Sequence, residues 1–84
     1  LDGTLCKKED IIKYALNELN IKNSNAIMIG DREHDMIGAS RNNITSIGVT
    51  YGFGSPEELK NADASYVINT VDELFKKIIS LNIQ

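Results

Sequence analysis

Two aspartates form the first group of residues that could do chemistry. Segment 30–35, Gly-Asp-Arg-Glu-His-Asp, follows the short apolar run 26–29 and places Asp31 and Asp35 four residues apart. If a helix begins next to Asp31, the two carboxylates lie on one helix face, roughly 6 Å apart. Such a pair suits Mg²⁺, which is commonly held by one or two carboxylates, water and substrate phosphate. His34 is the one nearby transition-metal ligand, and in a charged helix start we expect it to be exposed.

The same aspartates have a second interpretation as helix caps. Acidic side chains are favoured at the positive end of a helix. The spacing of Asp31 and Asp35 alone supports capping at least as well as metal binding, so a second motif is needed to choose between them.

The first residues of the chain supply that motif. Leu1-Asp2-Gly3-Thr4 resembles the second half of the Asp-x-Asp-Gly-Thr signature of the haloacid dehalogenase (HAD) superfamily. Segment 30–35 resembles the acidic fourth motif of that superfamily, which holds magnesium. Lys8 looks like its third-motif lysine, with Lys7 as the competing candidate. The stretch 8–68 is similar to the carboxyl-terminal part of phosphoglycolate-phosphatase-like members.

This resemblance implies hydrolysis of a phosphate monoester through an aspartyl-phosphate intermediate. Asp2 would be the general acid and base and would join Asp31 and Asp35 as ligands of Mg²⁺. Lys8 would neutralise charge on the transferring phosphoryl group. The implied partner is a small phosphorylated metabolite, which these residues do not identify because specificity in such enzymes lies largely in a cap domain.

Two departures from the family pattern concern the nucleophile and the cap. The nucleophilic aspartate would stand two residues before Asp2, which is a position before Leu1. The cap would stand between the first motif and Lys8, where this chain has three residues. We therefore expect residues 1–84 to form a single partial HAD-like core with a deletion seam near residues 5–6, inactive alone. The initial Leu1 likewise suggests that upstream residues were removed or omitted.

Two other function classes stay open. A catalytically dead HAD-like remnant could serve as a binding or assembly module and self-associate through exposed strand edges. A receiver-like phospho-acceptor domain also gathers acidic residues beside a lysine, but in a different order along the chain.

Helices and short apolar runs alternate along the chain, which predicts the elements that position these residues. We expect helices from Glu9, over 33–41, from Pro56, where Ser55 and Glu58 have capping-box spacing, and after Thr70, where Glu73 repeats that spacing. The first of these helices would bury an apolar stripe of Ile12, Ala15, Leu16 and Leu19. The last helix would bury a stripe of Val71, Leu74, Phe75, Ile78 and Ile79.

Between these helices lie three candidate strands, at 26–29, 44–49 and 65–68. The alternation predicts an α/β fold of the Rossmann-like type, three layers with a parallel sheet between helices. Strand 26–29 is continuously apolar, so we expect it to be buried on both faces. Ligands of such sheets bind beyond the carboxyl ends of the strands, where Asp31 lies.

Composition excludes several function classes. The 84 residues are 42% hydrophobic and 25% charged, as in globular proteins, and the net charge of −3 comes without a basic run. We therefore expect no nucleic-acid partner. No apolar run is long enough to cross a bilayer, so we expect no membrane partner and a cytoplasmic location. Cys6 is the single cysteine and can form no internal disulfide.

Overall fold

The structure is a computed structural model that describes residues 7–81. The predicted alternation of helices and strands is confirmed for these residues. In chain order the elements are α1 (Lys8–Glu18), the 3₁₀ helix η1 (Asn23–Asn25), β1 (Ile27–Gly30), α2 (Glu33–Arg41), β2 (Thr45–Val49), α3 (Pro56–Asn61), β3 (Tyr66–Ile68) and α4 (Val71–Leu81).

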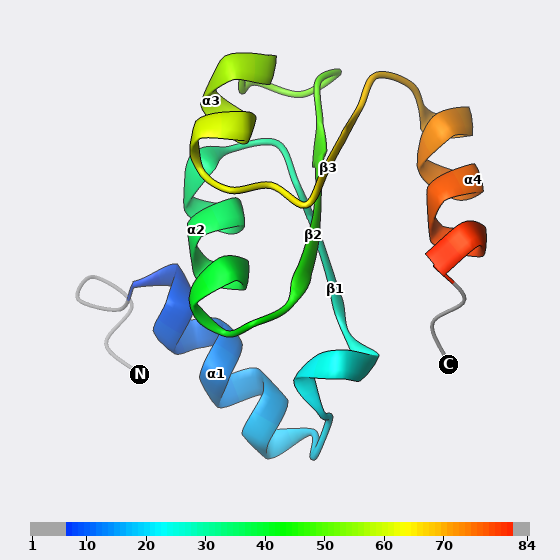
Figure 1. Cartoon of the computed structure of the whole chain (residues 1–84). Coiled ribbons are helices and arrows are strands. Elements are labelled where there is room, and N and C mark those ends of the chain that lie inside the picture. The colour runs from blue at the N-terminus through cyan, green and yellow to red at the C-terminus, as the bar shows by residue number, and fades with distance from the viewer. Residues whose placement is uncertain (1–6, 82–84) are drawn as a thin grey trace.

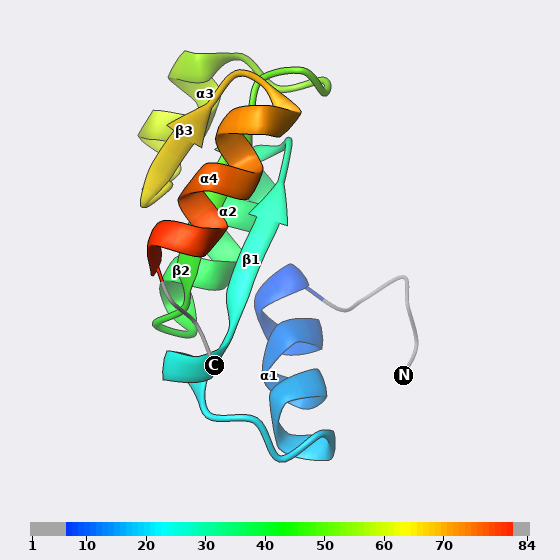
Figure 2. The same cartoon turned by 90° about the vertical axis from the view of Figure 1, so that its right-hand side faces the viewer.

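The three strands form one parallel sheet in the order β1-β2-β3. β1 and β2 are each followed by a helix, α2 or α3, that returns the chain to the start of the next strand. Right-handed crossovers in one direction put their helices on one face, so α2 and α3 lie on the same side, with α1 beside α2. The opposite side carries α4, and the two views show three layers (Figures 1 and 2). The predicted fold class is confirmed.

Local sequence signals explain where the helices begin and end. The Ser55 hydroxyl accepts a hydrogen bond of 3.0 Å from the Glu58 amide, and Pro56 occupies the first helical position of α3. The chain leaves α2 through Asn43 and α3 through Asp63, whose φ angles are 57° and 66°. Asn and Asp tolerate this left-handed conformation better than most residues, which is why the chain turns there.

The core consists of small clusters on both faces of the sheet. On the α1–α3 face, one cluster contains Ile12, Ala39 and Ile44, and a second contains Met36, Leu59 and Ala62. On the α4 face, Ile47, Val49 and Ile68 pack against partly buried α4 residues, Leu74, Ile78 and Leu81. Gly48 lets Leu59 lie directly on β2, because a Cβ there would be tight against that side chain.

Part of the predicted apolar pattern is wrong. Ile29 is 43% exposed, so β1 is not buried on both faces, and Phe75 and Ile79 of α4 are 60% and 77% exposed. On α1, Ile12 is buried but Ala15 and Leu19 are exposed. The physical reason is that, within residues 7–81, β1 has a neighbouring strand on only one side. The side chains next to this unpaired edge therefore have no further strand beside them to complete their burial.

Within residues 7–81, no helix has the length and apolar character needed to cross a membrane. The cytoplasmic location stays a prediction. The suspected seam near residues 5–6 and the motif at residues 1–4 lie outside the described residues.

Candidate active site

Asp31 lies at the carboxyl end of β1 and is held by the loop that follows β2. The Phe53 amide donates to Asp31 Oδ2 at 2.9 Å, and the Gly54 amide donates to the Asp31 carbonyl oxygen at 2.8 Å. The loop lies so close that a Cβ at Gly52 would overlap the Asp31 carboxylate, and one at Gly54 would overlap its carbonyl oxygen. Asp31 is thus fixed through both its side chain and its backbone.

Asp35 lies in the first turn of α2 and pairs with a lysine from a different element. Its Oδ1 is 3.1 Å from Lys8 Nζ, and its side chain is only 18% exposed. The carboxylate folds back over the end of β1, because a Cβ at Gly30 would overlap it. The stem of Lys8 runs over Gly38 of α2, whose missing side chain lets α1 approach closely. The structure therefore brings together two predicted site residues that lie 27 positions apart (35 minus 8).

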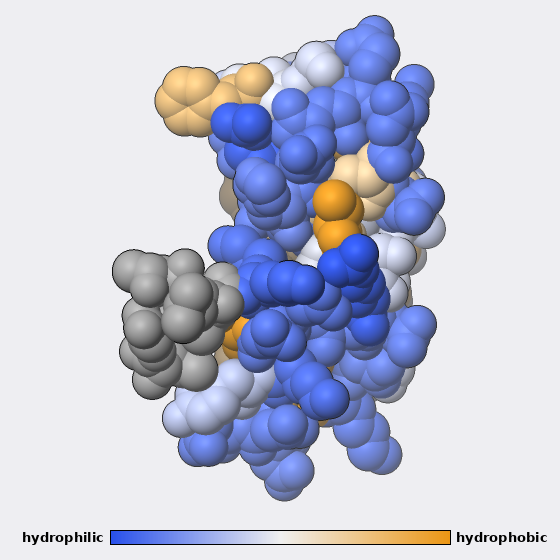
Figure 3. Space-filling view, turned by 90° about the vertical axis from the view of Figure 1, so that its left-hand side faces the viewer, coloured by the Kyte–Doolittle hydropathy of each residue, from blue (hydrophilic) through white to orange (hydrophobic). Residues whose placement is uncertain are grey.

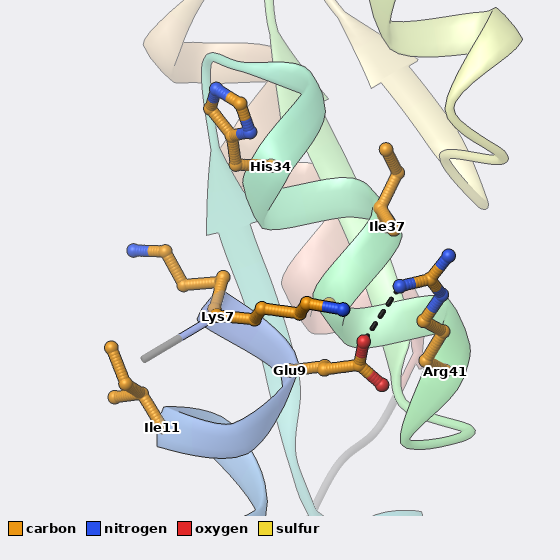
Figure 4. Close-up of a pocket in the computed structure, with 8 residues that line it drawn as sticks. Lys7, Glu9, Ile11, His34, Ile37 and Arg41 are labelled. Carbon is orange, nitrogen blue, oxygen red and sulfur yellow. Dashed lines mark hydrogen bonds and ion pairs between the residues drawn. The ribbon is translucent and has the colours of Figure 1, made fainter. Parts of the chain in front are cut away.

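Of the two candidate lysines, Lys8 is the one that contacts an acidic site residue. Both lysines help to line a groove between α1 and α2 with a volume of about 490 Å³, together with His34, Ile37 and other residues. Figure 4 shows this groove and the ion pair across it, in which Arg41 Nη1 lies 2.6 Å from Glu9 Oε1. His34 is exposed, as expected. The surrounding helical face is mostly hydrophilic (Figure 3).

The amino terminus of α2 receives its cap from Glu58 of α3. Glu58 Oε2 accepts hydrogen bonds from the Glu33 amide at 2.8 Å and from Arg32 Nε at 3.0 Å. The backbone hydrogen bond from Glu33, and then the Arg32 side chain, hold the pKa of the Glu58 carboxyl below its ordinary value. The same contact with Glu58 raises the pKa of Arg32.

This arrangement corrects the capping interpretation of the two aspartates. The residue at the N-cap position of α2 is Arg32, whose side chain makes no capping hydrogen bond. Among the described residues, the side-chain hydrogen bond to an α2 amide at this end comes from Glu58, whereas the Asp31 carboxylate accepts from the loop amide of Phe53. Asp35 still lies where the helix dipole favours a negative charge.

The carboxylates of this site suit a hard cation whose coordination is completed by other ligands. In the part of the chain that the structure describes, no group of three or more His, Cys, Asp or Glu side chains is arranged to hold a metal ion. Two carboxylates, Asp31 and Asp35, stand at the carboxyl edge of the sheet, and Mg²⁺ commonly uses only one or two, with water and phosphate oxygens as the rest. Asp2, the third predicted ligand, lies outside the described residues.

The interactions of Glu58 and of the Phe53 and Gly54 amides were missed by sequence reasoning. Capping-box spacing describes contacts within a few residues, and it cannot show that Glu58 reaches 25 positions away to Glu33. One signal was present: α2 begins after Arg32 rather than after Ser, Thr, Asp or Asn, so its first amides need an acceptor from another element.

Comparison with known proteins identifies a family and several relatives. A family model described as HAD-hydrolase-like matches residues 7–74. The 5'-nucleotidase of Pseudomonas aeruginosa is 50% identical over 60 residues, which are 71% of this chain and 27% of that protein. The phosphoglycolate phosphatase of Colwellia psychrerythraea is 33% identical over 63 residues, 75% of this chain and 28% of that protein.

Solved structures agree with these relatives. The crystal structure of a predicted phosphatase from Clostridium acetobutylicum has a TM-score of 0.88 and 67% sequence identity with this chain. The match covers 94% of this chain and 37% of that one. The chain thus spans between about a quarter and just over a third of the length of these relatives.

Proposed function

Because the chain belongs to the HAD-hydrolase-like family, we propose that it forms the cation-binding and phosphate-binding part of a magnesium-dependent phosphatase. The proposed substrate class is a small phosphate monoester. Two relatives, a 5'-nucleotidase and a phosphoglycolate phosphatase, support the reaction class but act on different substrates. What these two substrates share is a phosphorylated metabolite, which is the class proposed here.

One observation carries the proposal: the Lys8–Asp35 pair meets the strand end that bears Asp31. The ion pair is 3.1 Å long, and Asp31 is fixed by two hydrogen bonds from the 53–54 segment. Neither aspartate supplies the hydrogen bond that caps α2, because Glu58 does so. Two placed carboxylates and an ammonium group at the carboxyl edge of a parallel sheet support the proposal of a site for phosphate and its cation.

Each residue has a defined part in the proposed reaction. Asp31 and Asp35 would hold Mg²⁺, which when bound offsets the negative charge of the phosphoryl group. The Lys8 ammonium group would donate hydrogen bonds to phosphoryl oxygens and stabilise charge there. Asp2, by resemblance, would give a proton to the leaving oxygen and later take one from the attacking water.

The proposed bond changes occur at phosphorus. A carboxylate oxygen of the family's nucleophilic aspartate, at the position before Leu1, would form a bond to phosphorus while the ester oxygen leaves with a proton. Water would then hydrolyse the acyl phosphate and release inorganic phosphate. Covalent catalysis of this kind divides one difficult substitution into two easier steps.

A magnesium titration of the 84-residue chain tests the cation part of the proposal. We expect Mg²⁺ to shift the amide signals of residues 30–35 and 52–54 in a ¹H–¹⁵N spectrum. Asp31→Asn and Asp35→Asn are each expected to weaken this response at least about tenfold, because each removes an anionic ligand. Asp72→Asn is the matched control, since it removes one carboxylate from the exposed surface of α4, on the other side of the sheet. Equal responses in all four proteins would contradict the proposal.

The proposal also predicts what the chain does alone. Without a nucleophilic aspartate before Leu1, the 84-residue chain is expected to show no magnesium-dependent turnover of p-nitrophenyl phosphate. Measurable turnover that Asp31→Asn abolishes would contradict the assignment of the nucleophile.

A second candidate function, an assembly module that pairs with a second copy of itself, is favoured by the edge of β1 that has no neighbouring strand within residues 7–81. Ile29 shares the α4 face of β1 with Ile27, and Phe75 and Ile79 on α4 are also exposed. Light scattering after size-exclusion chromatography tests this proposal. It predicts a dimer that Ile29→Lys converts to a monomer, whereas Tyr14→Lys, at an exposed site on α1, leaves the dimer intact. A wild-type monomer at high concentration would exclude this function.

A further inference from the structure

Glu58 makes an interaction that its local sequence does not require. Ser55 and Glu58 have the spacing at which the glutamate side chain usually turns back to the first amide of its own helix. Half of this pattern is present, because the Glu58 amide donates to Ser55 Oγ at 3.0 Å. The carboxylate instead points away from α3 and binds the start of α2.

A single carboxylate oxygen binds two consecutive residues of the acidic segment. Glu58 Oε2 accepts from Arg32 Nε at 3.0 Å and from the Glu33 amide at 2.8 Å. These two residues lie between Asp31 and Asp35. The contact therefore fixes the backbone that joins the two aspartates and sets the positions of their carboxylates. The Glu58 side chain is 23% exposed.

The same part of the chain holds Asp31 from its other side. Phe53 and Gly54, which lead directly into α3, donate to Asp31 Oδ2 and to its carbonyl oxygen at 2.9 and 2.8 Å. Residues 53–58 therefore make four hydrogen bonds to residues 31–33, through backbone at one end and through Glu58 at the other.

We propose that Glu58 is a positioning residue, which braces the 31–35 segment against α3 and so sets the presentation of Asp31 and Asp35 to cation and phosphate. The consequence for metal affinity rests on the proposed function, whereas the bracing itself does not. Groups that hold metal-binding side chains in place typically change metal affinity by 10- to 100-fold when they are removed.

The test compares the 84-residue wild-type chain with Glu58→Gln, Arg32→Gln and the control Glu57→Gln. Glu57 is the preceding glutamate on α3, is exposed and carries the same charge. Three quantities are measured: amide hydrogen exchange at Glu33 and Gly54 without metal, the midpoint of a Mg²⁺ titration, and the thermal midpoint of unfolding.

Bracing by Glu58 predicts a specific pattern. Glu58→Gln is expected to speed exchange at Glu33 and Gly54 and to weaken Mg²⁺ binding by about tenfold. Arg32→Gln, which removes only the ion pair, gives a smaller effect, and Glu57→Gln gives none. The comparison with thermal midpoints separates positioning from a general loss of stability.

Two results would overturn the proposal. One is unchanged amide exchange in Glu58→Gln, and the other is a lower thermal midpoint with the Mg²⁺ titration unaltered. If the wild-type chain does not respond to Mg²⁺, the proposed function fails, and hydrogen exchange alone decides the bracing role. Faster exchange at Glu33 and Gly54 in Glu58→Gln then supports it, and unchanged exchange rejects it.

Discussion

Gly54→Ala is expected to damage the site and the fold together. Gly54 has no left-handed φ, so alanine could adopt its backbone conformation. The obstacle is steric, because the new Cβ would overlap the carbonyl oxygen of Asp31. That atom belongs to the backbone at the end of β1, so a change of side-chain rotamer cannot relieve the overlap.

The expected loss of stability depends on whether the loop withdraws from Asp31 or stays in place. If the loop withdraws, the hydrogen bonds of the Gly54 and Phe53 amides to Asp31 are lost, each worth about 0.5–1.5 kcal/mol net. If the loop stays, strain from overpacking costs about 1–3 kcal/mol instead. By either route we expect the free energy of unfolding to fall by roughly 1–3 kcal/mol, a sizeable part of the roughly 4–13 kcal/mol typical of a domain this size.

Urea unfolding followed by circular dichroism measures this loss, with the slope of the transition unchanged. Gly52→Ala is the informative comparison. Its Cβ would overlap the Asp31 side chain, both its carboxylate and its Cβ, and rotation of that side chain moves only the carboxylate. We expect this variant to lose Mg²⁺ affinity together with part of its stability. A loss below about 0.5 kcal/mol in Gly54→Ala, the range of ordinary surface changes, would refute the steric reasoning.

Three further predictions concern packing and charge. Leu59→Ala removes a fully buried side chain and is expected to lower the free energy of unfolding by roughly 2–5 kcal/mol in the same urea assay. Gly38→Ala would press a Cβ against the first turn of α1, so amide signals there should shift; an unchanged spectrum would contradict close packing of the two helices. Because Glu33 and Arg32 lower the pKa of Glu58, its carboxylate stabilises the fold above the unfolded-state pKa, and this contribution is lost as the pH falls through the folded-state pKa. A ¹³C titration should find that low pKa and its increase in Arg32→Gln, and Glu58→Gln should cost less stability in acid than at neutral pH.

The elements were predictable where local chemistry determines them. The bounds of α2 agree with the predicted range 33–41, and α3 begins at Pro56 after a Ser55 cap as expected. Asn43 follows α2 in the left-handed conformation, which asparagine tolerates better than most residues. These features depend on a few neighbouring residues, which is the range over which sequence patterns carry information.

The contacts between distant elements were not predictable in the same way. An apolar stripe on α4 predicts burial, but the stripe alone does not show that Phe75 and Ile79 are left exposed when α4 packs on the sheet. Likewise, capping-box spacing could not show that Glu58 serves α2. That Lys8 and Asp35 belong to one site was expected only through family resemblance, and their ion pair was not predicted, because their separation in sequence has no local pattern.

Paramagnetic broadening by Mn²⁺ in the 84-residue chain tests the central claim most directly. Mn²⁺ shares the preference for oxygen ligands and broadens the signals of nearby amides. If Asp31 and Asp35 hold the cation beside Lys8, substoichiometric Mn²⁺ should selectively broaden amides of residues 30–35, 52–54 and the first turn of α1, and excess Mg²⁺ should restore them. Broadening centred on another acidic region, such as the first turn of α4, or spread evenly over the surface, would contradict a cation site at this edge of the sheet.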